Sequence, residues 1–417
     1  MTASGSAAVP EIPLSSIGPF RLLLITRISS TTSNQMLGVA VGWQIYELTN
    51  SAFALGLIGL VQFAAPLLLS LVAGEAADRY DRRTIVRCCY VVQTLVTAGL
   101  LLLSLLPTPP VFAFYLLLLI NSFSRTFESP SLQALVANLV PREVLSRAVA
   151  AYSSSGRIAM LSGPAIGGFI FVYGADVNYF SCLSLIAVAS LASFLLPSMA
   201  AVKTKGKEKM SLSTLLAGMS FIWSTPVLLG VISLDLLATL FGGLTSLLPI
   251  YARDILHIGP WGFGLMRSAP SIGALVTGLV LARYPIKRAA GRIVFIGVAI
   301  YGVATILFGI SDNPLLSIFF LLMLGFGDML SVVVRQTQIQ IRTPDELRGR
   351  VSAVSSLSVS IGSQLGQFEA GMAATVFGTV GAVMFGGSVV LAIVAIWAWC
   401  FPELRRIERP DESPQAA

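Results

Sequence analysis

The sequence is poor in charged residues. Asp, Glu, Lys and Arg together make up 11% of the 417 residues, whereas 55% of the residues are hydrophobic. Soluble domains carry roughly 25% charged residues. This number of charged residues is too small to cover a surface that faces water. We therefore expect much of the surface of this protein to face lipid.

Other reactive residue types are also scarce, and this excludes several classes of function. The chain has one histidine, His257, and no H-E-x-x-H or Ser/His/Asp arrangement, which argues against a membrane enzyme. It has no G-x-x-x-x-G-K-[ST] loop, so ATP is not expected to drive it directly. The four cysteines show neither metal-ligand spacing nor a disulfide framework: Cys88, Cys89, Cys182 and Cys400. We therefore expect no enzymatic activity, no cofactor and no bound metal.

Long apolar runs fill most of the chain. A membrane-crossing helix needs about 20 mostly apolar residues, and in lipid a helix pairs all its own backbone groups. Turn-forming segments separate the runs, for example PTPP at 107–110 and SDNP at 311–314. The sequence therefore predicts an all-α membrane protein with twelve transmembrane helices. The predicted spans are 19–47, 52–74, 84–106, 111–138, 147–173, 177–199, 226–252, 260–284, 292–311, 314–341, 349–376 and 379–401.

The basic residues are concentrated in alternate connecting loops. One set of loops, together with Arg21, holds 21 of the 27 Lys and Arg residues, whereas the other set holds only Arg253. Loops rich in Lys and Arg face the cytoplasm, so both termini are expected there. The net charge of +7 then reflects membrane topology, and we expect no nucleic-acid partner. The N-terminal segment also lacks the basic region of a cleaved signal sequence.

The two halves of the chain repeat one another. Pro66 and Pro270 are 204 positions apart, and PREVLSRAVAAYSS (141–154) matches PDELRGRVSAVSS (344–356) at an offset of 203. This duplication predicts two six-helix bundles related by an axis along the membrane normal. The expected division is a tail (1–18), the first bundle (19–200), a linker (201–225), the second bundle (226–402) and a second tail (403–417). Within the linker, the amphipathic stretch 210–223 lies on the inner membrane face or begins the seventh span.

Ionisable residues inside the spans are the candidate functional residues, because buried charges are costly and usually face protein or water. The third, sixth, ninth and twelfth spans contain none apart from Arg87 and Arg292 at span ends, which belong to the basic loops. We therefore expect these four spans to face lipid and spans one, four, seven and ten to line a cavity. Four carboxylates are candidate proton carriers: Glu128, Asp235, Asp328 and Glu369. Five arginines either attract an anionic substrate or balance these acids: Arg27, Arg125, Arg157, Arg267 and Arg335.

Two of these candidates allow more than one interpretation. Arg125 and Glu128 are three residues apart on one helix face, so they are expected to pair. That pair is either a structural ion pair or a proton or substrate site. Glu369 lies in the outer half of its span among Gly and Gln residues, where a packing or gating role is as reasonable as proton transfer.

The charge-dense segment 74–83, GEAADRYDRR, resembles the loop between the second and third helices of the major facilitator superfamily of transporters. The family pattern is G-x-x-x-D-R-x-G-R-[RK]. Gly74, Asp78, Arg79, Arg82 and Arg83 match it, whereas Asp81 replaces the usual Gly. The resemblance implies that the matching residues form an inner gate. The alternative is that the cluster mainly sets topology.

Further motifs extend this resemblance. GPAIGG, with Gly163, Pro164, Gly167 and Gly168, resembles the end of the fifth-helix signature of antiporters in the superfamily, although Ala150 and Ala159 replace its upstream glycines. Ordinary tight helix packing explains this motif equally well. The stretches 41–57, 139–150 and 343–354 resemble the exporter branch that contains enterobactin exporters and macrolide-efflux proteins.

The exporter resemblance implies a proton-driven exporter of small molecules in the inner (plasma) membrane, working by alternating access. We expect the protein to be a monomer and its substrates to be small amphipathic molecules. Its expected partners are a small-molecule substrate, protons and the lipid bilayer, with apolar or aromatic cavity walls around the substrate. Two alternatives remain open. One is uptake or facilitated diffusion of a metabolite or metal chelate, and the other is a transport-dead sensor or scaffold.

Overall fold

The computed structural model describes residues 13–197 and 212–408, and these two ranges are helical almost throughout, without a strand. The first half contains η1 (Leu14–Ser16), α1 (Gly18–Thr49), α2 (Ala52–Arg79), α3 (Arg82–Ser104), α4 (Val111–Leu139), η2 (Arg142–Val144), α5 (Leu145–Phe171) and α6 (Ala175–Phe194). The second half contains α7 (Leu212–Ser224), α8 (Pro226–Phe241), η3 (Leu244–Leu247), α9 (Leu248–Ile250), η4 (Tyr251–Ile255), α10 (Gly259–Arg283), α11 (Ala290–Gly309), α12 (Pro314–Arg342), α13 (Asp345–Cys400) and α14 (Pro402–Arg406).

These elements form twelve membrane-crossing segments. Nine stretches within the described ranges are long and apolar enough to cross a membrane, with Pro226–Ile255 counted as one of them. One of the nine, α13, is two spans, because the backbone of Gly378 (φ 72°, ψ 168°) breaks it in a region that favours glycine. α1 and α5 are equally long but richer in polar residues. Together these segments confirm the predicted twelve-helix membrane fold.

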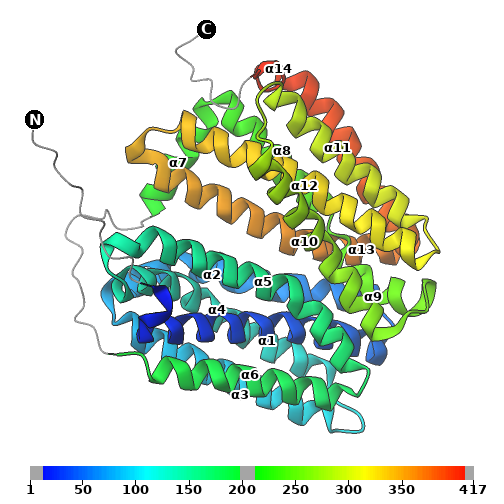
Figure 1. Cartoon of the computed structure of the whole chain (residues 1–417). Helices are drawn as coiled ribbons and strands as arrows, with labels where there is room; N and C mark the ends of the chain where they lie inside the picture. Colours follow the sequence, from blue (N-terminus) through cyan, green and yellow to red (C-terminus); the bar gives the residue numbers. More distant parts are fainter. Residues whose placement is uncertain (1–12, 198–211, 409–417) are drawn as a thin grey trace, which may run out of the picture.

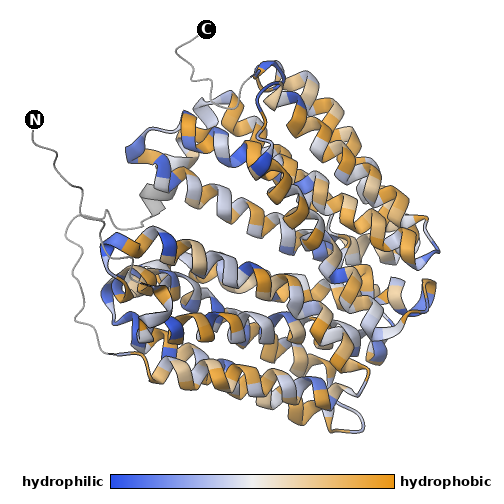
Figure 2. Ribbon diagram, viewed as in Figure 1, coloured by the Kyte–Doolittle hydropathy of each residue, from blue (hydrophilic) through white to orange (hydrophobic). Residues whose placement is uncertain are grey.

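The two halves lie side by side and meet through two pairs of helices (Figure 1). α2 packs against α13, and α5 packs against α10. α3, α6, α11 and the second part of α13 lie at the periphery and expose large apolar side chains, such as Leu95 (67%), Phe180 (61%) and Trp399 (82%). Hydrophilic residues gather near the helix ends, whereas hydrophobic residues cover the middle of the helices (Figure 2). This distribution matches a bundle whose sides face lipid.

The seventh span differs from its prediction as one helix over 226–252. α8 ends at Phe241, and the chain continues through η3, α9 and η4. Gly242 and Gly243 lie at the break, where atoms of neighbouring spans occupy the space that a side chain would need. A Cβ at Gly243 would lie 2.2 Å from the carbonyl carbon of Gly366, and the Tyr301 hydroxyl donates to the Gly242 carbonyl at 2.8 Å. A side chain of a neighbouring helix thus forms a hydrogen bond with a backbone group near the break.

The charged segment 74–83, expected to be a loop, is mostly helical. α2 continues to Arg79 and α3 begins at Arg82, so only Tyr80 and Asp81 connect them. The Asp81 carboxylate caps α3 by accepting hydrogen bonds from the Arg83 backbone N–H (3.2 Å) and the Thr84 hydroxyl (3.0 Å). The residue that departs from the family pattern therefore has a structural role.

The segments next to the bundles also pack against them. α7 covers most of the amphipathic stretch 210–223 and lies against α13 and α8; residues 210 and 211 are outside the described ranges. Leu404 and Ile407, which the sequence analysis assigns to the second tail, are buried. The carbonyls of Ile407 and Glu408 accept hydrogen bonds from the first N–H groups of α11 at 3.1 and 3.2 Å. This segment therefore supplies hydrogen-bond acceptors for the first backbone N–H groups of α11, which have no partner within the helix.

Candidate functional site

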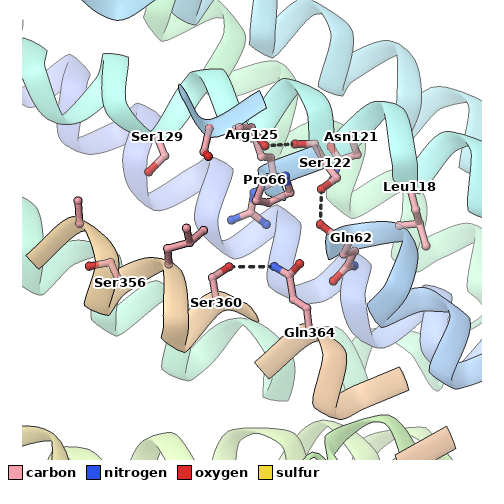
Figure 3. Close-up of a pocket in the computed structure, with 14 residues that line it drawn as sticks. Gln62, Pro66, Leu118, Asn121, Ser122, Arg125, Ser129, Ser356, Ser360 and Gln364 are labelled. Carbon is pink, nitrogen blue, oxygen red and sulfur yellow. Dashed lines mark hydrogen bonds between the residues drawn. The ribbon is translucent and has the colours of Figure 1, made fainter. Parts of the chain in front are cut away.

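A cavity of about 580 Å³ lies between the two halves (Figure 3). Ten of its 14 lining residues have polar side chains, and none is aromatic. The aromatic walls that the sequence suggested are therefore absent from the lining of this cavity. Its lining comes from α2, α4 and the first part of α13: Gln62, Pro66, Ser70, Leu118, Asn121, Ser122, Arg125, Thr126, Ser129, Ala353, Ser356, Leu357, Ser360 and Gln364.

The spans that line the cavities differ from the expected set of one, four, seven and ten. Only span four of that set, α4, contributes to the large cavity. A second cavity of about 30 Å³ shares Gln62 and Leu118 with the first, and it also has residues of α1, η3, α9 and α10 in its wall. The broken seventh span thus reaches this smaller cavity through Thr245, Ser246 and Pro249.

The halves approach closely at one end of the bundle. We call it the far end, where α1 ends and α2 begins; the opposite end, where α2 ends and α3 begins, is the basic end. A Cβ at Gly371 of α13 would lie 2.6 Å from the Cα of Gly56 of α2, and a Cβ at Gly168 of α5 would lie 2.7 Å from the Cα of Gly264 of α10. Backbones of opposite halves therefore touch near the far end. The large cavity lies on the basic-end side of these contacts.

Polar contacts also join the halves at the far end. The Tyr46 hydroxyl donates to the Asp254 carboxylate, and the Arg253 guanidinium donates to the Asn50 side-chain oxygen at 3.0 Å. Arg253 also lies over the Tyr46 ring, 5.4 Å from its centroid. This cluster was not predicted from the sequence. The sequence signal for it was the adjacent pair Arg253 and Asp254, because Arg253 is the one basic residue in the outer loops.

Glu128 and Arg125 do not form the expected pair. Among the described residues, no ion pair joins them; Glu128 is 5% exposed and accepts hydrogen bonds from the Tyr90 hydroxyl (2.8 Å) and the Gln93 amide (2.7 Å) of α3. Arg125, one turn earlier on α4, is exposed in the large cavity. The two side chains leave the helix toward different neighbours.

The hydrogen bonds around Glu128 continue to the cavity wall. The Asn34 amide donates to the Gln93 side-chain oxygen at 3.4 Å, and the Asn121 amide donates to the Asn34 oxygen at 3.1 Å. Asn121 lines the large cavity. A buried polar network of α1, α3 and α4 therefore links Glu128 to the cavity.

Asp235 and Arg335 form a buried ion pair between α8 and α12. Their side chains are each 4% exposed. The other two candidate acids, Asp328 on α12 and Glu369 on α13, are half-buried and make no hydrogen bond or ion pair with another described residue. The four acids therefore have three kinds of surroundings. Asp235 has a cationic partner, Glu128 has neutral hydrogen-bond donors, and Asp328 and Glu369 have no polar partner among the described residues.

The remaining predicted arginines are dispersed. Arg27 lies over the Tyr152 ring, 5.1 Å from its centroid. Arg267 donates to the Gly38 carbonyl at 3.1 Å across the two halves and lines the small cavity. Arg157 is exposed on α5 and is outside both cavity linings.

The residues of the predicted inner gate lie at the basic end. Gly74 and Arg79 are in the last turns of α2, and the Arg82 Nε donates to the Ala77 carbonyl at 3.0 Å. Arg83 follows in the first turn of α3. The side chain of Asp78 lies outside the described residues.

The GPAIGG segment of α5 contacts two helices at once. A Cβ at Gly163 would lie 2.6 Å from the Gln35 Cβ, and one at Gly167 would lie 2.8 Å from the Met36 Cα, both on α1. Gly168 and the Pro164 carbonyl face Gly264 of α10. The motif thus permits close packing within the first half and between the halves.

Comparisons with known proteins agree with this architecture. A sequence model of the Major Facilitator Superfamily matches residues 23–367. The enterobactin exporter EntS of Citrobacter koseri is 26% identical over 95% of both chains. EntS of an Escherichia coli strain is also 26% identical, over 94% of this chain and 93% of its own.

Solved structures of transporters share the fold. A point mutant of the nucleoside transporter NupG has a TM-score of 0.73 at 13% identity, covering 93% of this chain and 99% of its own. A bacterial homologue of the human lysosomal transporter Spinster has a TM-score of 0.73 at 16% identity, covering 97% and 100% of the two chains.

Proposed function

Because the chain belongs to the major facilitator superfamily of transporters, we propose that it exports a small molecule by alternating access, driven by protons that move inward. The cavity between the two halves carries this proposal. It lies toward the basic end, while glycine contacts close the far end. Loops rich in Arg and Lys face the cytoplasm, so this state offers the cavity to the cytoplasm and receives cargo from it.

The opposite state requires the far-end contacts to separate and the basic end to close. We propose that Gly74, Asp78, Arg79, Arg82 and Arg83 form the gate at that end, because they gather where α2 meets α3. In this proposal the protein is a monomer of the inner membrane with both termini in the cytoplasm. Each half moves as one six-helix bundle.

Glu128 is the proposed proton carrier. Its carboxylate accepts hydrogen bonds from two neutral donors, whereas the Asp235 carboxylate is paired with the cation of Arg335. The Tyr90 hydroxyl has a second acceptor, the Ser30 hydroxyl at 3.2 Å. When Glu128 binds a proton, the Tyr90 hydroxyl can turn to Ser30, so the site accommodates both protonation states.

Transport by Glu128→Gln in reconstituted vesicles tests this function. Enterobactin, named for the curated relatives, is the first compound to assay, followed by a panel of amphipathic drugs. We expect wild-type protein to accumulate its substrate only with a pH gradient. Glu128→Gln should lose this accumulation and retain exchange of substrate between the two sides, since exchange needs no net proton movement.

Glu47→Gln is the matched control. Glu47 is exposed near the far end of α1 and accepts a hydrogen bond from the Trp43 indole at 2.6 Å. This variant should accumulate substrate as the wild type does. Unchanged pH-driven accumulation by Glu128→Gln would remove Glu128 as the carrier, and equal wild-type rates with and without a gradient would disprove proton coupling.

A further inference from the structure

Arg125 is the one charged residue among the 14 that line the large cavity. It is exposed there and makes no hydrogen bond or ion pair with another described residue. Three other arginines of the spans are engaged: Arg335 pairs with Asp235, Arg267 donates to a backbone carbonyl, and Arg27 lies over a tyrosine ring. The donors of Arg125 are thus available to a ligand.

Across the cavity, α13 presents a second unsatisfied group. The Gln364 amide N–H donates to the Ser360 hydroxyl at 3.4 Å, but its side-chain oxygen is buried without a hydrogen-bond partner. A buried acceptor of this kind costs free energy until a donor reaches it. Figure 3 shows the Arg125 guanidinium pointing into the cavity toward the side where α13 carries Ser360 and Gln364.

These two groups require complementary chemistry from one ligand. A guanidinium binds both oxygens of a carboxylate through two parallel hydrogen bonds. The Gln364 oxygen requires a hydroxyl or N–H donor. A cavity of about 580 Å³ is within the usual size range for small-molecule sites.

We infer that the cavity binds a small organic anion: Arg125 holds its carboxylate-like group, and Gln364 accepts a hydrogen bond from a neighbouring hydroxyl or N–H of the same ligand. The inference rests on the proposed transport function and names its substrate class. Arg125 belongs to α4 of the first half and Gln364 to α13 of the second. The ligand therefore contacts both halves, and a relative movement of the halves separates its two binding groups.

Binding of three matched probes to the purified full chain tests the inference. Salicylate offers a carboxylate and an adjacent hydroxyl, benzoate offers the carboxylate alone, and salicylamide is uncharged at neutral pH. Isothermal titration in detergent at neutral pH measures each affinity. We expect salicylate to bind at least tenfold more tightly than benzoate or salicylamide.

Two variants assign the contacts. Arg125→Gln should weaken salicylate and benzoate binding at least tenfold and leave salicylamide unchanged. Gln364→Leu should weaken salicylate about tenfold, to the level of benzoate, without changing benzoate itself. Arg147→Gln removes the same charge from an exposed site at the start of α5 and should leave all three affinities as in the wild type.

Equal salicylate affinity in Arg125→Gln and the wild type would overturn the inference. So would tighter binding of salicylamide than of salicylate, or no binding of any probe at millimolar concentration. The assay needs neither a membrane nor a pH gradient, so its outcome is independent of proton coupling. Anion binding without pH-driven transport would contradict the proposed function alone, whereas proton-driven export of neutral compounds without anion binding would contradict this inference alone.

Discussion

At the scale of single residues, two buried carboxylates have opposite surroundings. Asp235 contacts the guanidinium of Arg335, and Glu128 contacts only a phenol and an amide. A buried charge without a partner is strongly unfavourable, whereas a paired one is tolerated. The Asp235–Arg335 pair is therefore expected to stabilise the fold of the second half, whereas Glu128 is the proposed proton carrier.

The ion pair predicts a specific loss of stability. Asp235→Asn keeps the size of the side chain but leaves Arg335 buried beside a neutral group. We expect it to destabilise the protein by about 3–5 kcal/mol and to lower the midpoint of thermal unfolding in detergent. Asp235→Leu combined with Arg335→Met removes both charges and should recover most of the loss. An unfolding midpoint of Asp235→Asn equal to that of the wild type would show that the pair contributes nothing.

The sequence identified which residues carry charge inside the spans, because a charge within an apolar run is a local signal. It did not identify their partners. Arg125 and Glu128 are near neighbours on α4, yet Glu128 turns to Tyr90 and Gln93 of α3. Partner choice depends on which helix lies on each side, and the uncharged Tyr90 and Gln93 gave no local signal that the third span is the partner of Glu128.

At the scale of helices, glycine sets how closely the halves approach. The pairs Gly56/Gly371 and Gly168/Gly264 place backbones of opposite halves in contact. Small residues at helix crossings are a common means of packing in membranes. In the proposed cycle the halves separate at these crossings, so the glycine contacts also set the stability of one conformation.

Gly168→Val should therefore open the far end. The added side chain overlaps Gly264, and overpacking of this kind costs about 1–3 kcal/mol, or roughly a 5- to 150-fold shift between two states. Spin labels at the exposed Thr108 and Asp312, in far-end loops of opposite halves, measure the separation in a background without Cys88 and Cys400. We expect a larger distance in the variant.

Gly349→Ala is the matched control, because a Cβ there has no atom within 4 Å. It should leave the distance distribution unchanged. A distribution in Gly168→Val that matches the wild type would mean that the glycine contact does not control the far end.

Element boundaries were predictable where they depend on the length of an apolar run. The fourth span, expected at 111–138, is Val111–Leu139, and the expected gap between the last two spans contains Gly378. The break in the seventh span was not predictable in this way. At the break, Gly242 and Gly243 lie in close contact with Tyr301 and Gly366, which come from other spans and are far away in the sequence.

At the scale of the whole molecule, the proposed function requires that the cavity of the present state be open toward the cytoplasm and closed at the far end. Ser129→Cys, in the cavity wall on the basic-end side of α4, should react with a membrane-impermeant maleimide in inside-out vesicles and at least tenfold more slowly in right-side-out vesicles. Thr108→Cys at the far end should show the reverse pattern. Both variants need a background without the exposed Cys88 and Cys400. The same pattern for both positions would contradict the proposed orientation.

The repeat of the two halves and the long apolar runs were sufficient to predict the architecture. They were not sufficient to predict the cavity wall, which comes largely from α2 and α13 instead of the expected first, seventh and tenth spans. Charge placement shows which helices hold ionisable groups. It does not show how far apart the two halves stand, and that separation determines which uncharged polar residues, such as Ser356 and Gln364, become accessible.

The length of the connections at the basic end gives the two halves different freedom of movement. Two residues join α2 to α3, but six, 284–289, join α10 to α11. An extended chain spans about 3.5 Å per residue, so these connections reach roughly 10 and 25 Å between helix ends. The first hairpin is a short tether that obliges α2 and α3 to tilt together, whereas α10 has slack to slide or tilt apart from α11. The angle between α10 and α11 can therefore change more than the angle between α2 and α3, although the two pairs occupy corresponding places in the two halves.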